Sequence, residues 1–216
     1  MKHFFLLLLI TPLFLVSCTN DETIDDLNTN KNMLESYAIK RNANGSYTLT
    51  HVVSEGVQSI YNDDVKLNEV QLFYDGKALD KTFTHNYNII DNELNINFLS
   101  ENRTFQPKIK IIDDSPSERG VYGLLNDYTV SENANGTIKL QFEVDPGVSV
   151  AYSYNAVEKI NDVILSLDEN ATQQSFTKVF PRENNGTLKI DFVQPAPGRE
   201  IEYKKPRIIF EEPPAL

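Results

Sequence analysis

Hydrophobic and polar residues alternate with period two in several segments of this chain. In residues 137–144 every second side chain is apolar and lies on one face: Ile138, Leu140, Phe142 and Val144. Residues 94–98 and 188–192 show the same alternation. Because successive side chains of a strand point to opposite faces of a sheet, this pattern predicts strands with one buried and one solvated face. Such strands are typical of antiparallel sheets, and with no amphipathic helical pattern between them they predict an all-β protein.

An internal repeat determines the predicted domain organisation. Residues 36–61 align without gaps on residues 127–152, with 10 identities in 26 positions. Later segments align at slightly larger offsets: 68–84 on 161–177, and 94–98 on 188–192. The offset increases only between the aligned segments, where connections tolerate insertions. We therefore predict two copies of one domain.

Each copy is predicted to contain seven short strands. In the first copy the expected ranges are 36–41, 46–53, 57–61, 68–74, 79–85, 93–99 and 107–112. Asn44-Gly45 and Asn135-Gly136 fall between two such strands and are expected to form type I′ turns, in which both central residues have positive φ. Asp75-Gly76 and Asn185-Gly186 are expected to act in a similar way.

Seven short strands per copy, separated by turn residues, resemble the immunoglobulin-like β-sandwich class. The resemblance is to the broad class, because the chain has no Trp and so lacks the Cys…Trp…Cys signature of antibody domains. Another two-sheet topology stays open. The predicted organisation is two tandem seven-stranded antiparallel β-sandwiches, at 33–114 and 121–216, joined by a linker at 115–120.

The N-terminus is predicted to be an export signal. Lys2 is followed by an apolar core at 4–16, which is typical of a secretory signal peptide. These 13 residues are too few for a transmembrane helix, which needs roughly 20, and Pro12 interrupts them.

The apolar core ends in four residues with a distinctive order: Leu15, Val16, Ser17 and Cys18. They resemble the bacterial lipobox. The resemblance implies that the signal peptide, residues 1–17, is removed, that the Cys18 thiol receives a diacylglycerol, and that the new amine is acylated, for example by palmitate. Several acyl chains give the stable membrane attachment that a single chain does not. The alternatives are an ordinary cleaved signal with an incidental cysteine, and an uncleaved anchor.

Residues 18–32 are polar, acidic and without hydrophobic periodicity, so we predict a flexible tether. Four acidic residues near its start are similar to the export signal of surface lipoproteins in the Bacteroidetes group: Asp21, Glu22, Asp25 and Asp26. The resemblance implies a lipid-anchored protein of the outer membrane that is exposed on the cell surface.

Net charge and cysteine content exclude two classes of protein. The formal net charge is −11; without the signal peptide, whose one full charge is Lys2, 19 Lys+Arg against 31 Asp+Glu give −12. An acidic surface of this kind repels nucleic acid, so we expect no nucleic-acid partner. With one cysteine in the sequence, the fold cannot depend on intramolecular disulfides.

No motif for catalysis or metal binding is found after the signal peptide. Two histidines remain, His51 and His85, without zinc spacing, and no nucleophile elbow, Walker loop or dinucleotide glycine pattern occurs. His51 has the inward phase of a strand where the second copy has Phe142, which predicts a core residue. His85 ends a predicted strand and corresponds to Lys178, which predicts an exposed site. We expect a protein that is not an enzyme, although a hydrolase with two catalytic carboxylates stays open, since such pairs are defined in space.

Acidic residues in predicted loops are the candidates for a cofactor site. Calcium prefers clustered carboxylate oxygens. Five such residues fall in loops: Asp63, Asp64, Asp113, Asp114 and Glu118. Their spacing matches no calcium-binding loop, and acidic loop residues are usually hydrated. We therefore expect no cofactor, with calcium at the junction of the two copies as the alternative.

The function that these features favour is a non-enzymatic, lipid-anchored envelope or cell-surface protein. It would act as a binding, adhesion or spacer module with a protein partner. The alternative is a glycan-binding lipoprotein of an outer-membrane uptake complex, with exposed tyrosines such as Tyr87, Tyr122 or Tyr154 stacking on sugars. The absence of Trp weakens this alternative, because Trp offers the strongest aromatic platform.

Overall fold

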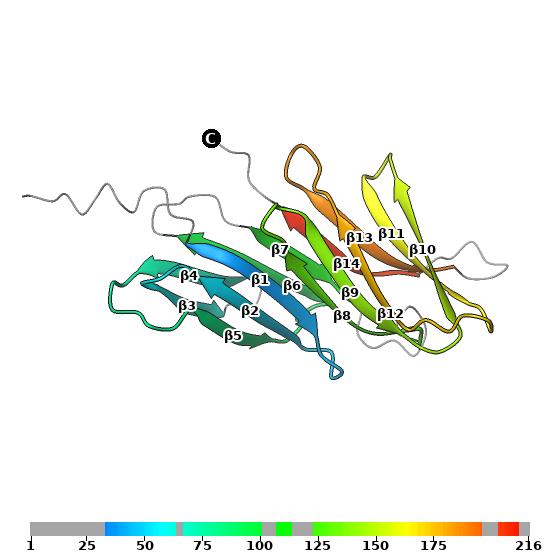
Figure 1. The fold of residues 1–216 in the computed structure, drawn as a ribbon, viewed down its shortest axis with the longest axis horizontal. Coiled ribbons are helices and arrows are strands. Elements are labelled where there is room, and N and C mark those ends of the chain that lie inside the picture. The colour runs from blue at the N-terminus through cyan, green and yellow to red at the C-terminus, as the bar shows by residue number, and fades with distance from the viewer. Residues whose placement is uncertain (1–32, 64–66, 101–106, 114–122, 196–202, 212–216) are drawn as a thin grey trace, which may run out of the picture. The chain divides into compact units, whose positions relative to one another are not determined.

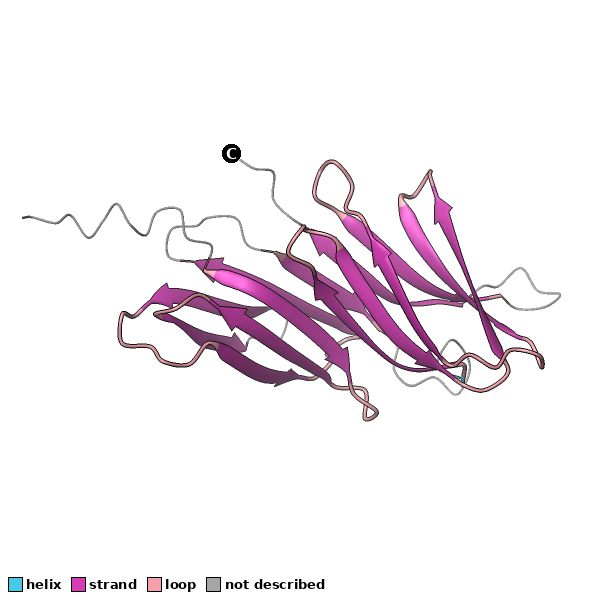
Figure 2. Cartoon of the chain, viewed as in Figure 1, coloured by secondary structure: helices cyan, strands magenta, loops and turns pink. Residues whose placement is uncertain are grey.

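The computed structural model describes residues 33–63, 67–100, 107–113, 123–195 and 203–211. Apart from one 3₁₀-helical turn at Gly123, the regular secondary structure in these ranges consists of β-strands (Figure 2). This confirms the prediction of an all-β protein. The predicted signal peptide, tether and linker lie outside the described residues.

The described residues form seven strands in each repeat. The first repeat contains β1 (Leu34–Arg41), β2 (Tyr47–Val53), β3 (Val57–Asp63), β4 (Asn68–Tyr74), β5 (Thr82–Tyr87), β6 (Glu93–Ser100) and β7 (Lys108–Ile112). The second contains β8 (Leu125–Glu132), β9 (Ile138–Val144), β10 (Val148–Asn155), β11 (Ile160–Leu167), β12 (Ser175–Phe180), β13 (Leu188–Gln194) and β14 (Tyr203–Glu211). The predicted ranges agree with these strands, except that β5 lies two to three residues further along the chain than 79–85.

The strands form two sheets, and each sheet contains strands of both repeats (Figure 1). The six-stranded sheet has the order β12-β9-β8-β1-β2-β5. The eight-stranded sheet has the order β10-β11-β13-β14-β7-β6-β4-β3. The repeats therefore meet at two strand pairs, β1 with β8 and β7 with β14, and we call these two pairs the join.

The register of the join relates the two halves by an approximate twofold axis. In the first sheet Ile39 pairs with Val130, which is its own counterpart in the sequence repeat. In the second sheet Lys110 pairs with Ile209. These two residues are also counterparts, since Lys110 lies three positions after Pro107 and Ile209 three positions after Pro206. Antiparallel pairing of equivalent strands is the geometry that a twofold axis produces.

The two sheets face each other across a single hydrophobic core. Equivalent aromatic pairs connect them in each half: the ring centroids of Tyr37 and Phe98 lie 5.7 Å apart, and those of Tyr128 and Phe192 lie 5.5 Å apart. Buried apolar residues of both repeats belong to the same cluster. Full burial of each large apolar side chain contributes about 1.5–3 kcal/mol, so the halves stabilise one another through shared burial.

The prediction of purely antiparallel sheets is wrong for two strand pairs. β4 pairs with β6 in parallel, and β11 pairs with β13 in parallel. Between β4 and β6 the chain crosses to the other sheet to form β5 and then returns. It reverses direction twice on this path, so β6 runs in the same direction as β4. Parallel neighbours need a connection of a dozen or more residues, and residues 75–92 supply it.

The predicted type I′ turn at Asn44-Gly45 is also wrong. Gly45 has φ 80°, but Asn44 does not have positive φ. The amide of Gly45 donates to the carbonyl of Asn42, and the amide of Asn42 donates to the carbonyl of Ser46. This is a type I turn followed by a left-handed glycine. The Asn44 side chain favours it, because its Oδ1 accepts from both the amide and the hydroxyl of Ser46.

The same turn recurs at residues 133–137 and 183–187. The type I′ turn occurs instead at Asp91-Asn92, where φ is 52° and 64°, between Ile90 and Glu93.

Because the halves share one core and both sheets, they should unfold together. Leu49 and Leu140 occupy equivalent, fully buried positions. Leu49→Ala and Leu140→Ala should each lower the free energy of unfolding by about 2–5 kcal/mol. Each should also speed hydrogen exchange of the slowest amides in both halves, which native-state exchange with mass spectrometry measures. Leu79→Ala, at a side chain that is 92% exposed, is the control and should change neither quantity. Faster exchange in the substituted half alone would show that the repeats unfold as independent domains.

Candidate functional site

Three apolar side chains lie close together on the solvent-facing side of the eight-stranded sheet in the first half. Ile60 on β3 is 52% exposed, and Leu99 on β6 is 37% exposed. Gln71 on β4 lies between them, since it pairs with Ile60 on one side and with Leu99 on the other. Phe73 follows on the same face of β4. We call Ile60, Gln71, Phe73 and Leu99 the outer patch.

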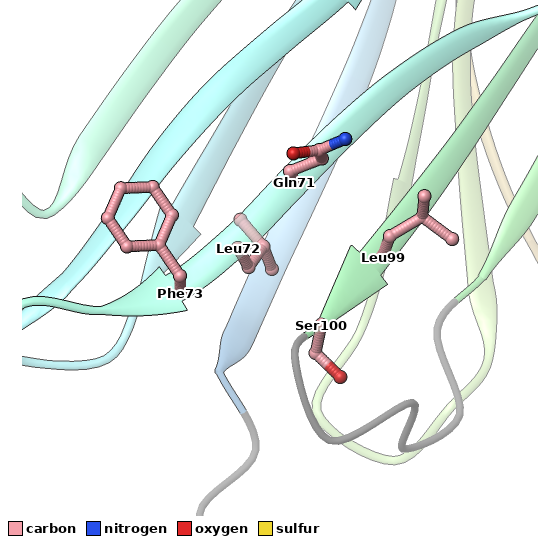
Figure 3. A pocket seen from close by; sticks show the side chains of 5 residues that line it. All are labelled: Gln71, Leu72, Phe73, Leu99 and Ser100. Carbon is pink, nitrogen blue, oxygen red and sulfur yellow. The ribbon is translucent and has the colours of Figure 1, made fainter.

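A pocket of about 280 Å³ adjoins the outer patch and shares three residues with it, Gln71, Phe73 and Leu99 (Figure 3). Its lining comes from the C-terminal parts of β4 and β6: Gln71, Leu72, Phe73, Leu99 and Ser100. Figure 3 shows the Phe73 ring on one side of Leu72 and the Leu99 side chain on the other. The volume lies just below the usual range for ligand pockets, about 300–1,000 Å³. The pocket can therefore take one apolar side chain or one sugar ring.

The local sequence explains why this face is apolar. Leu72-Phe73 and Phe98-Leu99 are consecutive apolar residues within alternating strands. Since neighbours in a strand point to opposite faces, Leu72 and Phe98 enter the core, while Leu99 and the half-buried Phe73 lie on the solvent side. Sequence reasoning missed the outer patch, and these two doublets were the available signal.

The second half does not reproduce the outer patch. The counterparts of Ile60, Phe73 and Leu99 are the smaller residues Ala151, Ser166 and Val193, and Ile164 takes the place of Gln71. They have the same register, because Ala151 pairs with Ile164 and Ile164 pairs with Val193. The outer patch is therefore a property of the first half and is not required by the fold.

Between β3 and β5, at the side edge of the first half, aromatic and charged groups cover the core. The rings of Tyr61 and His85 stack with a centroid distance of 4.2 Å, and His85 Nε2 lies 2.8 Å from Asp63 Oδ2. The prediction of an exposed His85 is wrong, because its side chain is 27% exposed and takes part in this cover. The cause is the position of β5, which continues past His85 to Tyr87.

The second half closes its edge with a different pair at equivalent positions. Lys178 on β12 replaces His85, and its Nζ lies 4.9 Å from the centroid of the Tyr152 ring on β10. A cation over an aromatic face is attracted by the ring quadrupole. Both edges are thus covered by a tyrosine and a basic side chain, which is a structural role.

Two of the three tyrosines expected to stack on sugars lie on strands of different halves, Tyr87 on β5 and Tyr154 on β10. Tyr87 is buried, so the expectation that it is exposed is wrong; burial and the nearby Asp63 charge raise its pKa. Tyr154 is 49% exposed, and its hydroxyl donates to Glu183 at 2.6 Å. Tyr122 lies outside the described residues.

His51 is fully buried, as its inward phase predicts. Its ring stacks on Phe83 with a centroid distance of 5.6 Å, and its Nε2 lies 2.9 Å from Ser59 Oγ. Burial lowers the pKa of His51 to about 4, so the neutral form fills the core position. In the second half Phe142 and Val150 replace this histidine and serine.

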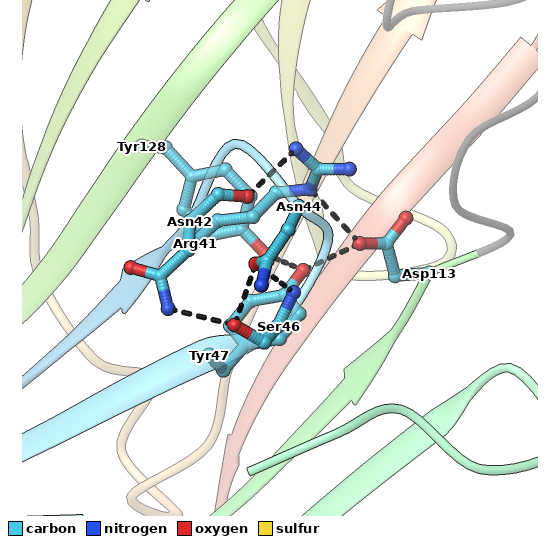
Figure 4. Close-up of polar contacts among 7 residues, drawn as sticks. All are labelled: Arg41, Asn42, Asn44, Ser46, Tyr47, Asp113 and Tyr128. Atoms are coloured by element: carbon cyan, nitrogen blue, oxygen red, sulfur yellow. Dashed lines mark hydrogen bonds and ion pairs between the residues drawn. The ribbon is translucent and has the colours of Figure 1, made fainter. Parts of the chain in front are cut away.

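A buried polar network crosses the join (Figure 4). The Asp113 carboxylate accepts from Arg41 Nε at 3.2 Å and from the Tyr47 hydroxyl at 2.6 Å. The Tyr47 hydroxyl lies 2.8 Å from the hydroxyl of Tyr128, which belongs to the second repeat. Burial raises the pKa of Tyr128, and the Asp113 charge raises it further.

A second ion pair lies on the opposite side of the join. Glu132 is the counterpart of Arg41 in the repeat, and its Oε1 lies 3.1 Å from Arg182. Arg182 Nε also donates to the carbonyl of Gly136 at 3.0 Å. The two equivalent positions therefore carry opposite charges.

These contacts account for two of the acidic residues considered for calcium. Asp113 is part of the buried network, and Asp63 binds His85. Asp64, Asp114 and Glu118 lie outside the described residues. Within the described ranges, no group of three or more His, Cys, Asp or Glu side chains is arranged to hold a metal ion.

Comparison with known proteins gives no relative for this chain. No protein-family model matches it, and no curated protein or solved structure shows significant similarity to it. In the part of the chain that the structure describes, no helix has the length and apolar character needed to cross a membrane. Cys18, the preceding motif and the acidic tether residues lie outside that part and stay predictions.

The burial of His51 should make stability fall at acidic pH. The unfolded chain, with a histidine pKa of about 6.5, takes up the proton before the native chain, with a pKa of about 4. The contribution of neutral His51 is therefore complete above pH 6.5 and is lost as the pH falls from 6.5 to 4, at up to about 1.4 kcal/mol per pH unit. The double variant H51F/S59V has, at these two positions, the residues found at the equivalent positions of the second half, Phe142 and Val150. Between pH 7 and 4.5 it should lose about 2 kcal/mol less than the parent, as measured by urea unfolding.

The single variant S59V retains the histidine and is the control, which should keep the acid loss of the parent. An equal loss of stability in H51F/S59V and in the parent would contradict the role of His51.

Proposed function

We propose that this protein is an exported lipoprotein, held to the outer membrane by acyl chains on Cys18 and exposed on the cell surface. Its β-structure acts as a non-enzymatic binding module for a protein partner. The observation that carries the binding role is the outer patch, where Ile60, Phe73 and Leu99 lie on the solvent side of neighbouring strands.

The outer patch brings three apolar side chains together around Gln71. Burying their surface against a partner gains about 25 cal/mol per Å² of apolar area, and exposed apolar patches mark interaction sites. Gln71 at the centre of the outer patch is uncharged, so no charge must be desolvated there when a partner binds. The patch therefore suits an apolar protein surface with one side chain that enters the pocket.

The spacing between lipid and folded structure supports attachment at Cys18. Fifteen residues, 19–33, separate Cys18 from the start of β1 at Leu34. A polar segment of this length has an end-to-end distance of roughly 20–25 Å when flexible. The folded structure would thus stand clear of the lipid headgroups and could turn the outer patch toward a partner.

For the architecture, we propose that each repeat, 33–114 and 121–216, corresponds to one seven-stranded unit of the immunoglobulin-like class, with 115–120 as the connection. The equivalent strand order in the two halves supports this. The parallel β4–β6 and β11–β13 pairs are where these units depart from the antiparallel sheets of that class.

Glycan binding is the second candidate, and the Phe73 pocket favours it. An aromatic ring beside the Gln71 amide offers a stacking face and a hydrogen-bonding group in a space of one sugar ring. The ligand would then be a polysaccharide of an uptake complex.

Replacement of Cys18 tests the anchor. Cys18→Ser should move the protein from the membrane fraction to the soluble fraction, or stall its processing, because the thiol that accepts the diacylglycerol is gone. Metabolic labelling with a palmitate analogue should label the parent and leave C18S unlabelled. A C18S protein that is processed and still membrane-bound would refute the anchor. Protease applied to intact cells should digest the parent if it is surface-exposed.

Residues of the second half provide a matched test of the outer patch. I60A/F73S installs the counterparts Ala151 and Ser166, so the strands should fold as they do in the second half. Crosslinking on intact cells should recover a protein partner with the parent, and at least tenfold less of it with I60A/F73S. The control L79A removes an exposed apolar side chain elsewhere and should keep full crosslinking.

A polysaccharide panel separates the second candidate from the first. Micromolar binding that F73S abolishes would establish the glycan ligand. Partner crosslinking and polysaccharide binding that are both unchanged in I60A/F73S would exclude the outer patch as the binding surface.

A further inference from the structure

Four strands have an unpaired edge in the described structure: β5 and β12 in one sheet, β3 and β10 in the other. An unpaired edge presents backbone N–H and C=O groups that can pair with another chain. Proteins commonly protect such edges with charged side chains that point inward, which a second strand would have to bury.

Two of the four edges, β3 and β12, carry such a side chain, and a third, β5, carries a histidine that is bonded to one of them. Asp63 on β3 and His85 on β5 contact each other between the sheets, and Lys178 on β12 lies over the Tyr152 ring. The fourth edge strand, β10, has none of its own, and the charged groups that contact it belong to other elements: Lys178, Glu183 and Asp162. Its eight residues are Val-Ser-Val-Ala-Tyr-Ser-Tyr-Asn, without Asp, Glu, Lys, Arg, His or Pro, in a chain with net charge −11.

The β10 edge is also regular and accessible. It pairs with β11 from Val148 to Asn155 without a bulge, so its outer side keeps the straight geometry that another strand needs. Ala151, Tyr152, Ser153 and Tyr154 are all exposed. Tyr152 and Tyr154 are 37% and 49% exposed, although they belong to the inward-facing set of the strand.

We propose that the protein forms a dimer through β10, which pairs antiparallel with β10 of a second copy about a twofold axis at Tyr152. This proposal goes beyond the binding role of the outer patch and does not depend on the lipid anchor. A second copy is the occupant that the charge pattern favours, because self-pairing of an acidic chain is least opposed at the edge strand that has no Asp, Glu, Lys, Arg or His of its own. The join shows that the sheets of this protein accept this geometry, since β1–β8 and β7–β14 are antiparallel pairs of equivalent strands.

The register follows from the faces of the strand. When the twofold axis passes between the same residue of both strands, directly opposite residues of the two β10 strands point to the same face of the sheet. Inward-facing side chains of one copy therefore lie beside inward-facing side chains of the other. With the axis at Tyr152, that residue faces itself, Val150 faces Tyr154 of the second copy, and Ala151 faces Ser153. Aromatic and β-branched pairs across strands are favourable, by about 0.2–1 kcal/mol each. The axis lies within the exposed run 151–154, whereas the other end of β10 is covered, since Gly147 is hydrogen-bonded to the loop at Asp168 and Ala171.

Charge substitutions on the solvent face test both the edge and the register. The C18S protein, free of acyl chains, is measured by analytical ultracentrifugation up to about 100 µM, a range in which a dimer of micromolar Kd assembles. It should show a concentration-dependent monomer–dimer equilibrium. A151K/S153K places like charges opposite each other twice and should weaken the dimer at least tenfold. A151K/S153E places opposite charges there and should keep or strengthen it.

A control separates this effect from net charge. L79K/I90K adds the same two charges at exposed positions of the first half and should dimerise as the C18S parent does. A monomeric parent at all concentrations would overturn the proposal, as would a dimer that A151K/S153K does not weaken. Loss of the dimer in A151K/S153E as well would overturn the Tyr152 register.

A cysteine on the axis provides an independent readout. Directly opposite Cα atoms in an antiparallel pair lie about 4.5–5.5 Å apart, within the range that a disulfide spans. In the C18S background, Y152C should form a covalent dimer under mild oxidation, whereas A151C, which faces Ser153, should form much less. Equal crosslinking of Y152C and A151C would refute the axis.

Discussion

Backbone hydrogen bonding between equivalent strands of the two repeats is the constraint on which the rest of this structure depends. If β1 did not pair with β8 and β7 did not pair with β14, each half would expose two further strand edges beside an open core. Pairing at the join removes these edges and lets buried residues of both halves form one cluster. A half of this size buries a smaller fraction of its surface than the joined structure does, so the join also supplies stability that a single repeat would lack.

The charged residues beside the join differ between the two repeats. Arg41 binds Asp113 on one side of the twofold axis, while its counterpart Glu132 binds Arg182 on the other. Buried ion pairs contribute little net stability, because desolvation offsets most of their attraction. Each ion pair lies within one repeat, whereas the side-chain hydrogen bond between the Tyr47 and Tyr128 hydroxyls, at 2.8 Å, crosses the join. We infer that the two copies diverged at these charged positions after duplication.

The sequence predicts the strands well because burial on one face imposes alternation on each strand by itself. It does not predict how the strands pair, since the join and the parallel β4–β6 pair connect residues that are far apart in the chain. A small error in one boundary had a larger consequence. Ending the fifth strand at residue 85 made His85 and Tyr87 appear exposed, whereas β5 continues to Tyr87 and both side chains cover the core edge. The sequence shows the outer patch only as two apolar doublets, Leu72-Phe73 and Phe98-Leu99. One residue of each doublet points to each face of the sheet, and which of them is exposed depends on which face is covered by the other sheet.

The place of β1 has a mechanical consequence. The segment that begins at Cys18 enters the fold at β1, which is hydrogen-bonded to β2 along one side and to β8 along the other. A pull along this strand from an acylated Cys18 would load the hydrogen bonds of both ladders in shear, all at once, instead of opening them one after another. If Cys18 is held to a membrane, such a load would therefore fall on a strand in the interior of a sheet, and both of its ladders would have to break together.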